Sequence, residues 1–283
     1  MASGSRRKYI DCPEAMIETV REFGIIPFFR NPVPGWSIED MTAPGCWFDT
    51  DGVLGPWDWK IEVVRDGIAY GKMLGDRAAF ATEEWYRELM NYRRSLPKYR
   101  IALGEKPRAK ATSKHEKLLR MLSKPALDAI RQSGALESRQ LRMILSESIT
   151  PAQIRSLGAS YKKLLVPAVK KSISDSVLTY LQMGTWCLVG DIERVYRGPD
   201  LVYSGWQTSS NTTPEQYFDN RCSPSEGIRP DDDMPSWARR FMDDEPVAVQ
   251  TVLGTPEESR IKIVSHIHEL FPEADIAAIE KLV

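Results

Sequence analysis

The chain has 283 residues, of which 42% are hydrophobic and 9% aromatic, and its formal net charge is −1. This composition is typical of a folded globular protein, and the length allows two or three compact modules. No apolar run reaches the ~20 residues that span a bilayer, and the basic start lacks the apolar stretch of a signal peptide. We therefore predict a cytoplasmic protein with no membrane partner. The four cysteines are too widely spaced for a metal site, so we expect neither a metal nor another cofactor.

The small net charge conceals an asymmetry along the chain. Residues 93–124 contain eleven Lys or Arg and only two Glu, whereas acidic runs occupy 231–233 and 243–245. A basic middle region is compatible with a polyanionic partner, although a solvated charged surface is the commoner explanation of such a run.

A helix is predicted near the start, with Asp11 as its N-cap, Pro13 in its first turn and Gly24 at its end. Strand-like runs follow at 57–64 and 68–74. Between these two strands, Arg65-Asp66-Gly67 indicates a hairpin, because Asp-Gly favours tight turns.

A third short strand at 78–81 and a helix at 83–94 complete the predicted N-terminal part. Residues 97–113 are typical of a linker or a basic loop. Beyond it the pattern predicts helices at 114–123, 125–133, 136–145 and 160–183.

The most informative pattern follows the last of these helices. Strands are predicted at 185–190 and 201–207, and Arg197-Gly198-Pro199-Asp200 between them has turn chemistry. A helix followed by a hairpin forms the back half of a winged-helix module, whose helix commonly enters a nucleic-acid groove. Any α+β domain can also contain a helix and a hairpin, so the pattern alone leaves both interpretations open.

These elements predict an α+β, helix-rich fold of tandem winged-helix-like modules with short antiparallel hairpins and no convincing internal repeat. The predicted divisions are 1–96 as an N-terminal module, 97–113 as a basic linker, 114–219 as a helical winged-helix module and 220–283 as an acidic helical region. Within the last region, Thr255-Pro256-Glu257-Glu258 is a capping box that opens a helix.

The sequence around Asp58 is the first candidate for a catalytic site. On a strand, Trp57 and Trp59 would share one face, and Asp58 and Lys60 the other. A carboxylate at the mouth of an aromatic-lined pocket is suited to acid–base work, because burial raises its pKa. The alternative is a half-buried strand with two core tryptophans and an exposed ion pair.

A second candidate is the string from Phe48 to Leu54. It resembles the signature of haloacid-dehalogenase-type phosphatases, with Asp49 as nucleophile, Asp51 as general acid and Gly190-Asp191 as the later motif. No alternating strand–helix pattern surrounds it, so a turn before a strand is the alternative.

Nucleic-acid contact is the third candidate, and it rests on basic and short polar side chains. The candidate contacts are Arg93, Arg94, Lys98, Arg100, Lys106, Arg108 and Lys110 of the basic segment, Ser174 and Thr179 of the helix before the wing, and Arg194 and Arg197 of the wing.

The strings GPWDWK, IAYGK, AFATEEWY and NYRR, together with LTYLQMGTWCLVGDIERV, Gly205-Trp206 and Thr213-Pro214-Glu215, resemble those of the AlkZ-related proteins over most of residues 10–283. That family is named for its kinship with the AlkZ/YcaQ DNA glycosylases, which are built from tandem winged helices and excise alkylated bases. The resemblance implies a winged-helix fold and a role in DNA metabolism.

Those glycosylases carry a short Gln-x-Gln or Gln-x-Asp motif that positions water. The similar string in this chain is Gln182-Met183-Gly184, which lacks the second polar residue. The catalytic candidates are therefore Asp58 first and Gln182 second, and Trp57, Trp59 and Tyr70 are candidates for stacking against an extruded base.

The leading prediction is a DNA-binding winged-helix protein with double-stranded DNA as its partner. If the protein is an enzyme, we expect a metal-independent DNA glycosylase acting on alkylated bases. The alternatives are a non-catalytic winged-helix interaction scaffold and, third, a phosphatase acting through Asp49 and Asp51. Charge reversal of Arg93, Arg94 and Lys98 is expected to weaken DNA binding.

Overall fold

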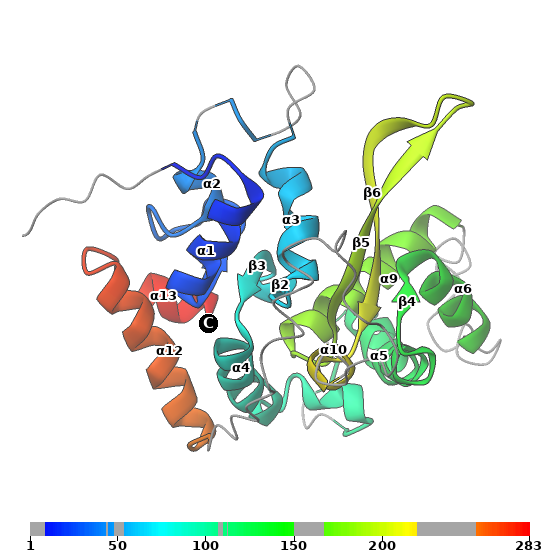
Figure 1. Cartoon of the computed structure of the whole chain (residues 1–283). Helices are drawn as coiled ribbons and strands as arrows, with labels where there is room; N and C mark the ends of the chain where they lie inside the picture. The colour runs from blue at the N-terminus through cyan, green and yellow to red at the C-terminus, as the bar shows by residue number, and fades with distance from the viewer. Residues whose placement is uncertain are drawn as a thin grey trace, which may run out of the picture.

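A computed structural model describes residues 9–43, 45–47, 54–106, 110–111, 113–149, 167–219 and 253–283. Within these ranges the chain has an α+β fold in which helices surround two small antiparallel sheets of three strands each (Figure 1). The sequence prediction of an α+β, helix-rich fold is confirmed.

The first sheet belongs to an N-terminal unit that we define as α1 to β3. Its elements are α1 (Pro13–Phe23), β1 (Ile25–Pro27), α2 (Ile38–Met41), α3 (Pro56–Arg65), β2 (Ala69–Leu74) and β3 (Arg77–Ala81). The strand order in the sheet is β1-β3-β2, so the last strand lies in the middle. Helix α4 (Glu83–Ser95) and the single turn η1 (Arg100–Leu103) follow.

The second sheet belongs to a central unit that we define as α5 to β6. Its elements are α5 (Lys114–Ser133), β4 (Leu136–Glu137), α6 (Ser138–Ser148), α9 (Pro167–Met183), β5 (Leu188–Arg197) and β6 (Val202–Thr212). The strand order is β4-β6-β5, again with the last strand in the middle. The described elements of the two units therefore share one order, helix-strand-helix-helix-strand-strand, although the sequence shows no repeat.

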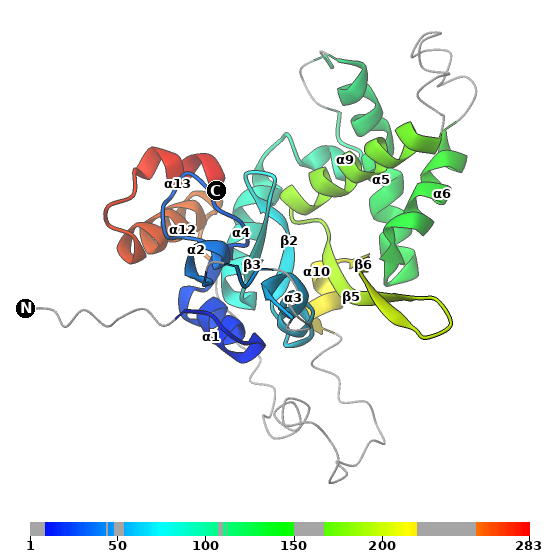
Figure 2. The ribbon, with the colours of Figure 1, turned by 90° about the horizontal axis from the view of Figure 1, so that it is seen from above.

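Three further helices follow the central unit: α10 (Pro214–Asp219), α12 (Pro256–Leu270) and α13 (Ile276–Leu282). Helix α12 packs on α4, and Figure 2 shows α12 and α13 on the side of the N-terminal unit, away from α5, α6 and α9. The predicted capping box at Thr255 is present, with both reciprocal hydrogen bonds.

The buried apolar side chains form two clusters. One cluster contains side chains of the N-terminal unit together with residues of α10, α12 and α13, and the other contains side chains of α5, α6 and α9. The start of β5 joins them, since Cys187 belongs to the second cluster and Leu188 to the first.

The prediction of a strand at 57–64 was wrong, because these residues belong to α3. Gly55 is the extended N-cap and Pro56 occupies the first turn, where its missing N–H is not needed. Seven of the ten residues of α3 are buried, Asp58 and Lys60 among them, so polar residues do not mark an exposed face as they do in a surface helix.

The predicted hairpin at Arg65-Asp66-Gly67 was therefore also wrong. Asp66 is the C-cap of α3, and the turn of the first hairpin lies at Gly75-Asp76, where both residues have positive φ. The strands at 68–74 and 78–81 are present.

Other boundaries differ from the prediction by smaller amounts. The N-cap of α1 is Cys12 rather than Asp11, and α5 is one helix with Pro125 inside it rather than two. Strand β6 continues to Thr212, so the second hairpin is longer than expected. Its turn is as predicted, with Gly198 at φ 76°.

Candidate functional site

Asp58 lies at the contact between α3 and the β5–β6 hairpin. Its Oδ1 accepts hydrogen bonds from the hydroxyl of Tyr203 at 2.5 Å and from Nε2 of Gln207 at 2.9 Å. Nε of Arg194 lies 3.6 Å from the same oxygen, and Nη2 of Arg194 donates to Glu62 at 3.3 Å. We call these five residues the α3–hairpin clasp.

The residues of the clasp are brought together by helix and strand geometry. Asp58 and Glu62 are one helical turn apart on α3, so they share a face. In the hairpin Arg194 pairs with Gln207, and Tyr196 with Tyr203, so these four side chains project from one side of the ribbon. Asp58 is only 2% exposed, whereas Tyr203 and Gln207 are half-buried.

Burial dominates the electrostatics of this region. Burial, together with the hydrogen bond to Asp58 that favours the neutral phenol, raises the pKa of Tyr203 to about 12. Three buried atoms around the clasp, Glu62 Oε2, Arg194 Nε and Gln207 Oε1, have no hydrogen-bond partner among the described residues. An unsatisfied buried polar group calls for an explanation, and a functional role is one such explanation.

Lys60 lies on the same helix but makes different contacts. Its ammonium group donates to the carbonyl oxygen of Trp57 at 2.7 Å and lies 3.3 Å from the centroid of the Trp57 ring. Burial lowers the pKa of Lys60 to about 7, and the negative charge of Asp58 opposes this shift only in part. The expected exposed ion pair between Asp58 and Lys60 is therefore replaced by two buried groups.

Two of the three aromatic candidates lie near one another, and the third does not share their position. Trp57 and Tyr70 both pack near Phe28, with ring centroids 6.4 and 6.0 Å from it, whereas Trp59 is buried in the core. The shared face predicted for Trp57 and Trp59 is absent, because neighbouring residues on a helix point in different directions. Burial raises the pKa of Tyr70 well above its usual value.

The β5–β6 hairpin projects beyond the rest of the described chain (Figures 1 and 2). Near its end it exposes four large apolar side chains: Tyr196, Leu201, Val202 and Trp206. Trp206 is the residue after Gly205, which has a φ of 72°, and its side chain is 67% exposed. Arg197 is exposed beside them at the start of the turn.

Two of the arginines that were predicted to contact phosphate form hydrogen bonds within the protein. The guanidinium of Arg93 is buried and donates to Tyr99 and to the carbonyl oxygens of Met73, Met183 and Leu282. Arg94 donates to the carbonyl oxygen of Thr185 and to Glu215, and it lies 4.5 Å from the centroid of the Trp186 ring. Both arginines therefore have structural roles.

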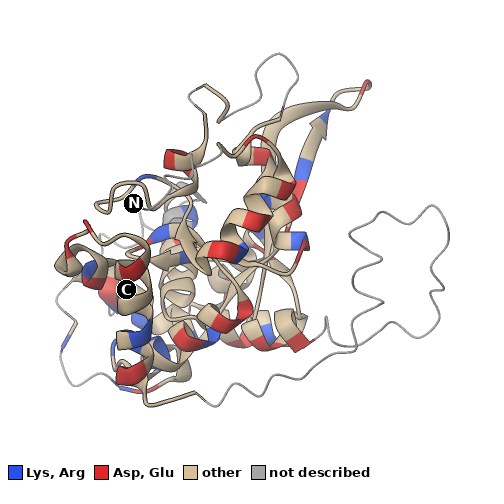
Figure 3. Cartoon of the chain, turned by 60° about the vertical axis from the view of Figure 1, so that its left-hand side comes forward, with Lys and Arg blue, Asp and Glu red and all other residues tan. Residues whose placement is uncertain are grey.

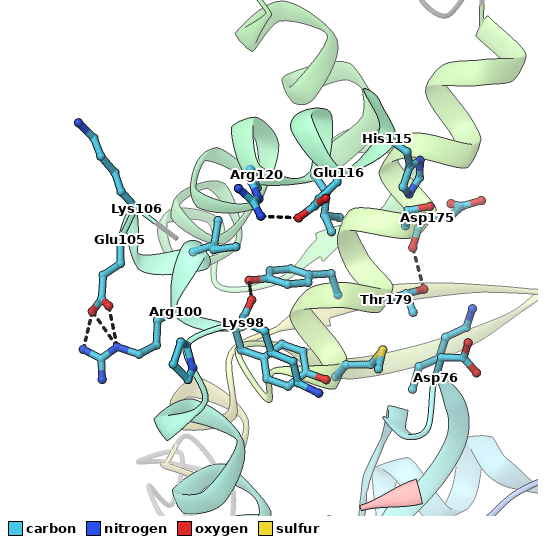
Figure 4. Close-up of a pocket in the computed structure, with 18 of the residues that line it drawn as sticks. Asp76, Lys98, Arg100, Glu105, Lys106, His115, Glu116, Arg120, Asp175 and Thr179 are labelled. Atoms are coloured by element: carbon cyan, nitrogen blue, oxygen red, sulfur yellow. Dashed lines mark hydrogen bonds and ion pairs between the residues drawn. The ribbon is translucent and has the colours of Figure 1, made fainter. Parts of the chain in front are cut away.

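The remaining candidate residues lie in several different places. Lys98, Arg100, Lys106 and Thr179 line one cavity, which Figure 4 shows, and Arg100 is paired there with Glu105. Lys110 is exposed, and Ser174 is buried. Arg108, Asp49 and Asp51 lie outside the described residues.

The side-chain amide of Gln182 forms two hydrogen bonds within the protein. Its Oε1 accepts from the backbone N–H of Lys72 at 2.9 Å, and its Nε2 donates to Asn211 Oδ1 at 3.1 Å. The amide thus ties α9 to β2 and β6. Asp191, the later acid of the phosphatase pattern, accepts a hydrogen bond from Arg65.

Tyr203, Gln207 and Glu62 were missed by sequence reasoning. The predicted turn at 197–200 implies that Tyr203 pairs with a residue near Tyr196, so the face that they share could have been predicted from the sequence. The sequence analysis could not indicate that this face contacts α3, because it predicted a strand and not a helix at 57–64.

The described part of the chain is thus an α+β protein with two three-stranded units of the same element order, joined by a polar clasp. The chain belongs to the AlkZ-related protein family, whose match covers residues 10–283. No curated protein and no solved structure matches the chain. No helix among the described residues is long and apolar enough to span a membrane.

Proposed function

We propose that the protein binds double-stranded DNA through two winged-helix units, as its membership of the AlkZ-related family suggests. The observation that carries the proposal is the projecting β5–β6 hairpin, with Trp206 and its apolar neighbours exposed and Arg197 beside them. Apolar side chains on a projecting ribbon can wedge between base steps, and an adjacent arginine can contact phosphate. The same element order and strand order in both units support the winged-helix assignment.

The overall charge distribution gives less support than the hairpin. In the view of Figure 3, basic and acidic residues are interspersed along the described helices and strands. DNA contact is therefore expected to depend on a few basic side chains, chiefly Arg197 and Lys98, rather than on a broad positive surface.

The first experiment is fluorescence-anisotropy titration of a labelled duplex across a salt series. We expect affinity to fall as salt rises, with a slope that Arg197→Glu reduces by about one, since each lost phosphate contact has that effect. Trp206→Ala should weaken binding at every salt concentration by roughly 1–3 kcal/mol.

The matched controls lie on the far side of the N-terminal unit. Lys281→Glu on α13 and Ile261→Ala on α12 change an exposed lysine and an exposed apolar residue without touching the hairpin. They should leave binding unchanged. Salt-independent binding, or none at low salt, would refute the proposal and favour a non-catalytic scaffold whose hairpin binds protein.

Excision of an alkylated base is the second candidate function. The observation in its favour is the buried carboxylate of Asp58 within an incompletely satisfied polar cluster. Because Oδ1 of Asp58 already accepts two hydrogen bonds, excision would require the clasp to open. Release of base from a methylated duplex should then be lost in Asp58→Asn but retained in Lys281→Glu, and absence of release by the unmodified protein rules out this activity.

A further inference from the structure

A cavity of about 1290 Å³ lies between the central unit and the hairpin of the N-terminal unit. Figure 4 shows it bordered by α9 with Asp175 and Thr179, by α5 with Glu116 and Arg120, by the segment from Lys98 to Lys106, and by Asp76 of the β2–β3 turn. Small-molecule sites commonly have volumes of roughly 300–1,000 Å³, so this cavity has room for a nucleotide together with adjoining backbone.

The floor of the cavity is mainly apolar. Tyr180 is half-buried there, with its hydroxyl donating to the carbonyl oxygen of Lys98 at 2.6 Å and its ring centroid 5.7 Å from that of Tyr99. Met183 and Leu119 complete this surface. Aromatic and sulfur-containing side chains of this kind provide a platform for a planar heterocycle.

The rim carries charges of both signs. Arg100 is paired with Glu105, and Arg120 with Glu116. Among the residues that the structure describes, the exposed lysines Lys72, Lys98 and Lys106 and the exposed carboxylates Asp76 and Asp175 form no ion pair. Lysines suit phosphate oxygens, and carboxylates accept from the amino groups of bases.

We infer that this cavity receives one unpaired nucleotide of a bound DNA strand, with its base on the Tyr180 floor and a flanking phosphate near Lys98 and Lys106. The inference rests on the proposed DNA binding. It also follows from the position of the cavity, since α9 is the helix that directly precedes the projecting hairpin.

The test compares a fully paired duplex with one that carries a single-nucleotide bulge, both titrated by fluorescence anisotropy with the full chain. We expect the bulged duplex to bind at least about fivefold more tightly, because stacking of the extra base is gained. Thr179→Trp introduces a bulky indole ring into the lining of the cavity, where it competes with the base for space, and the ratio of the two affinities should fall to about one. Among the described residues, the hydroxyl of Thr179 bonds only to its own helix, at the carbonyl oxygen of Asp175, so little of the described structure is lost.

Thr19→Trp is the matched control. Thr19 is also half-buried on a helix, and its hydroxyl donates to the carbonyl oxygen four residues earlier at 2.7 Å, as that of Thr179 does at 2.8 Å. This variant should keep the ratio of the unmodified protein. A ratio near one in the unmodified protein, or an unchanged ratio in Thr179→Trp, would overturn the inference and leave DNA binding intact.

Failure of both duplexes to bind would refute the proposed function instead. Saturation-transfer NMR with 2′-deoxyadenosine 5′-monophosphate then tests whether the cavity binds a nucleotide. Transfer that disappears in Thr179→Trp but persists in Thr19→Trp would support a nucleotide site, and absence of transfer to the unmodified protein would overturn it.

Discussion

At the residue scale, Lys60 shows how burial changes the chemistry of a side chain. It is only 4% exposed, and its ammonium is held by one carbonyl oxygen and one aromatic face. Because desolvation disfavours the charged form, burial lowers its pKa to about 7 from the 10.5 of a free lysine. The folded protein therefore releases this proton at a lower pH than the unfolded chain does.

This difference predicts a pH-dependent stability. Between pH 7 and about 10.5 the unfolded chain binds more protons at Lys60, so the free energy of unfolding should rise with pH, by at most about 1.4 kcal/mol per pH unit. Lys60→Met should remove this rise and be the more stable protein at pH 6. Urea denaturation of the unmodified protein and of Lys60→Met between pH 6 and about 10.5 measures the two free energies of unfolding. Parallel curves of this free energy against pH would contradict a lowered pKa of Lys60.

Sequence reasoning singled out Asp58, which the fold buries, but described its surroundings wrongly. The expected partners were residues adjacent in sequence, and the observed partners, Tyr203 and Gln207, lie about 150 residues away. Arg93 and Arg94 were likewise chosen for their charge, but the fold uses them to bind carbonyl oxygens. Charge alone does not reveal whether a side chain is buried, so reversal of Arg93 would test folding rather than DNA binding.

At the element scale, the clasp fixes the orientation of the hairpin relative to α3. The hydrogen bond between the hydroxyl of Tyr203 and the carboxylate of Asp58 is charge-assisted and largely buried, which strengthens it. The prediction of a strand at 57–64 failed here for a physical reason. A helix buried on most sides lacks the polar face that distinguishes helical from strand patterns.

A double-mutant cycle can test the clasp. Asp58→Asn and Tyr203→Phe should each destabilise the protein, and their effects should be coupled by about 1–3 kcal/mol, because the first removes the negative charge to which the hydroxyl donates and the second removes the hydroxyl. Unfolding in urea provides the four free energies. The pair Asp58→Asn with Ile261→Ala serves as a distant control and should be additive, and an equally additive Asp58–Tyr203 pair would show that the clasp contributes nothing.

At the scale of the whole molecule, the two units share an order of elements that the sequence does not display as a repeat. Topology depends on where helices and strands begin and end, and different side chains meet these requirements in the two units. The N-terminal unit buries its pre-hairpin helix α3 against the second hairpin, whereas α9 of the central unit borders an open cavity. These unequal surroundings explain why apolar patterns of equivalent helices diverge.

The buried guanidinium of Arg93 connects these parts through donated hydrogen bonds. It donates at 3.0 Å to the hydroxyl of Tyr99, at 3.1 Å to the carbonyl oxygen of Met183, and at 3.3 and 3.1 Å to those of Met73 and Leu282. The acceptors belong to the segment after α4, α9, β2 and α13. A single side chain therefore joins the N-terminal unit, the central unit and the C-terminal helix.

Arg93→Lys should consequently destabilise the protein by at least about 3 kcal/mol, since an ammonium cannot reproduce the planar array of donors and leaves buried carbonyl oxygens unpaired. Hydrogen exchange should accelerate in residues 276–283 and in β2 together, because both lose the same partner. Arg87→Lys is the control, since Arg87 pairs with Glu83 on the surface of α4 and should change stability by less than about 0.5 kcal/mol. Equal effects of the two substitutions, or faster exchange confined to α4, would mean that the three parts are held together without Arg93.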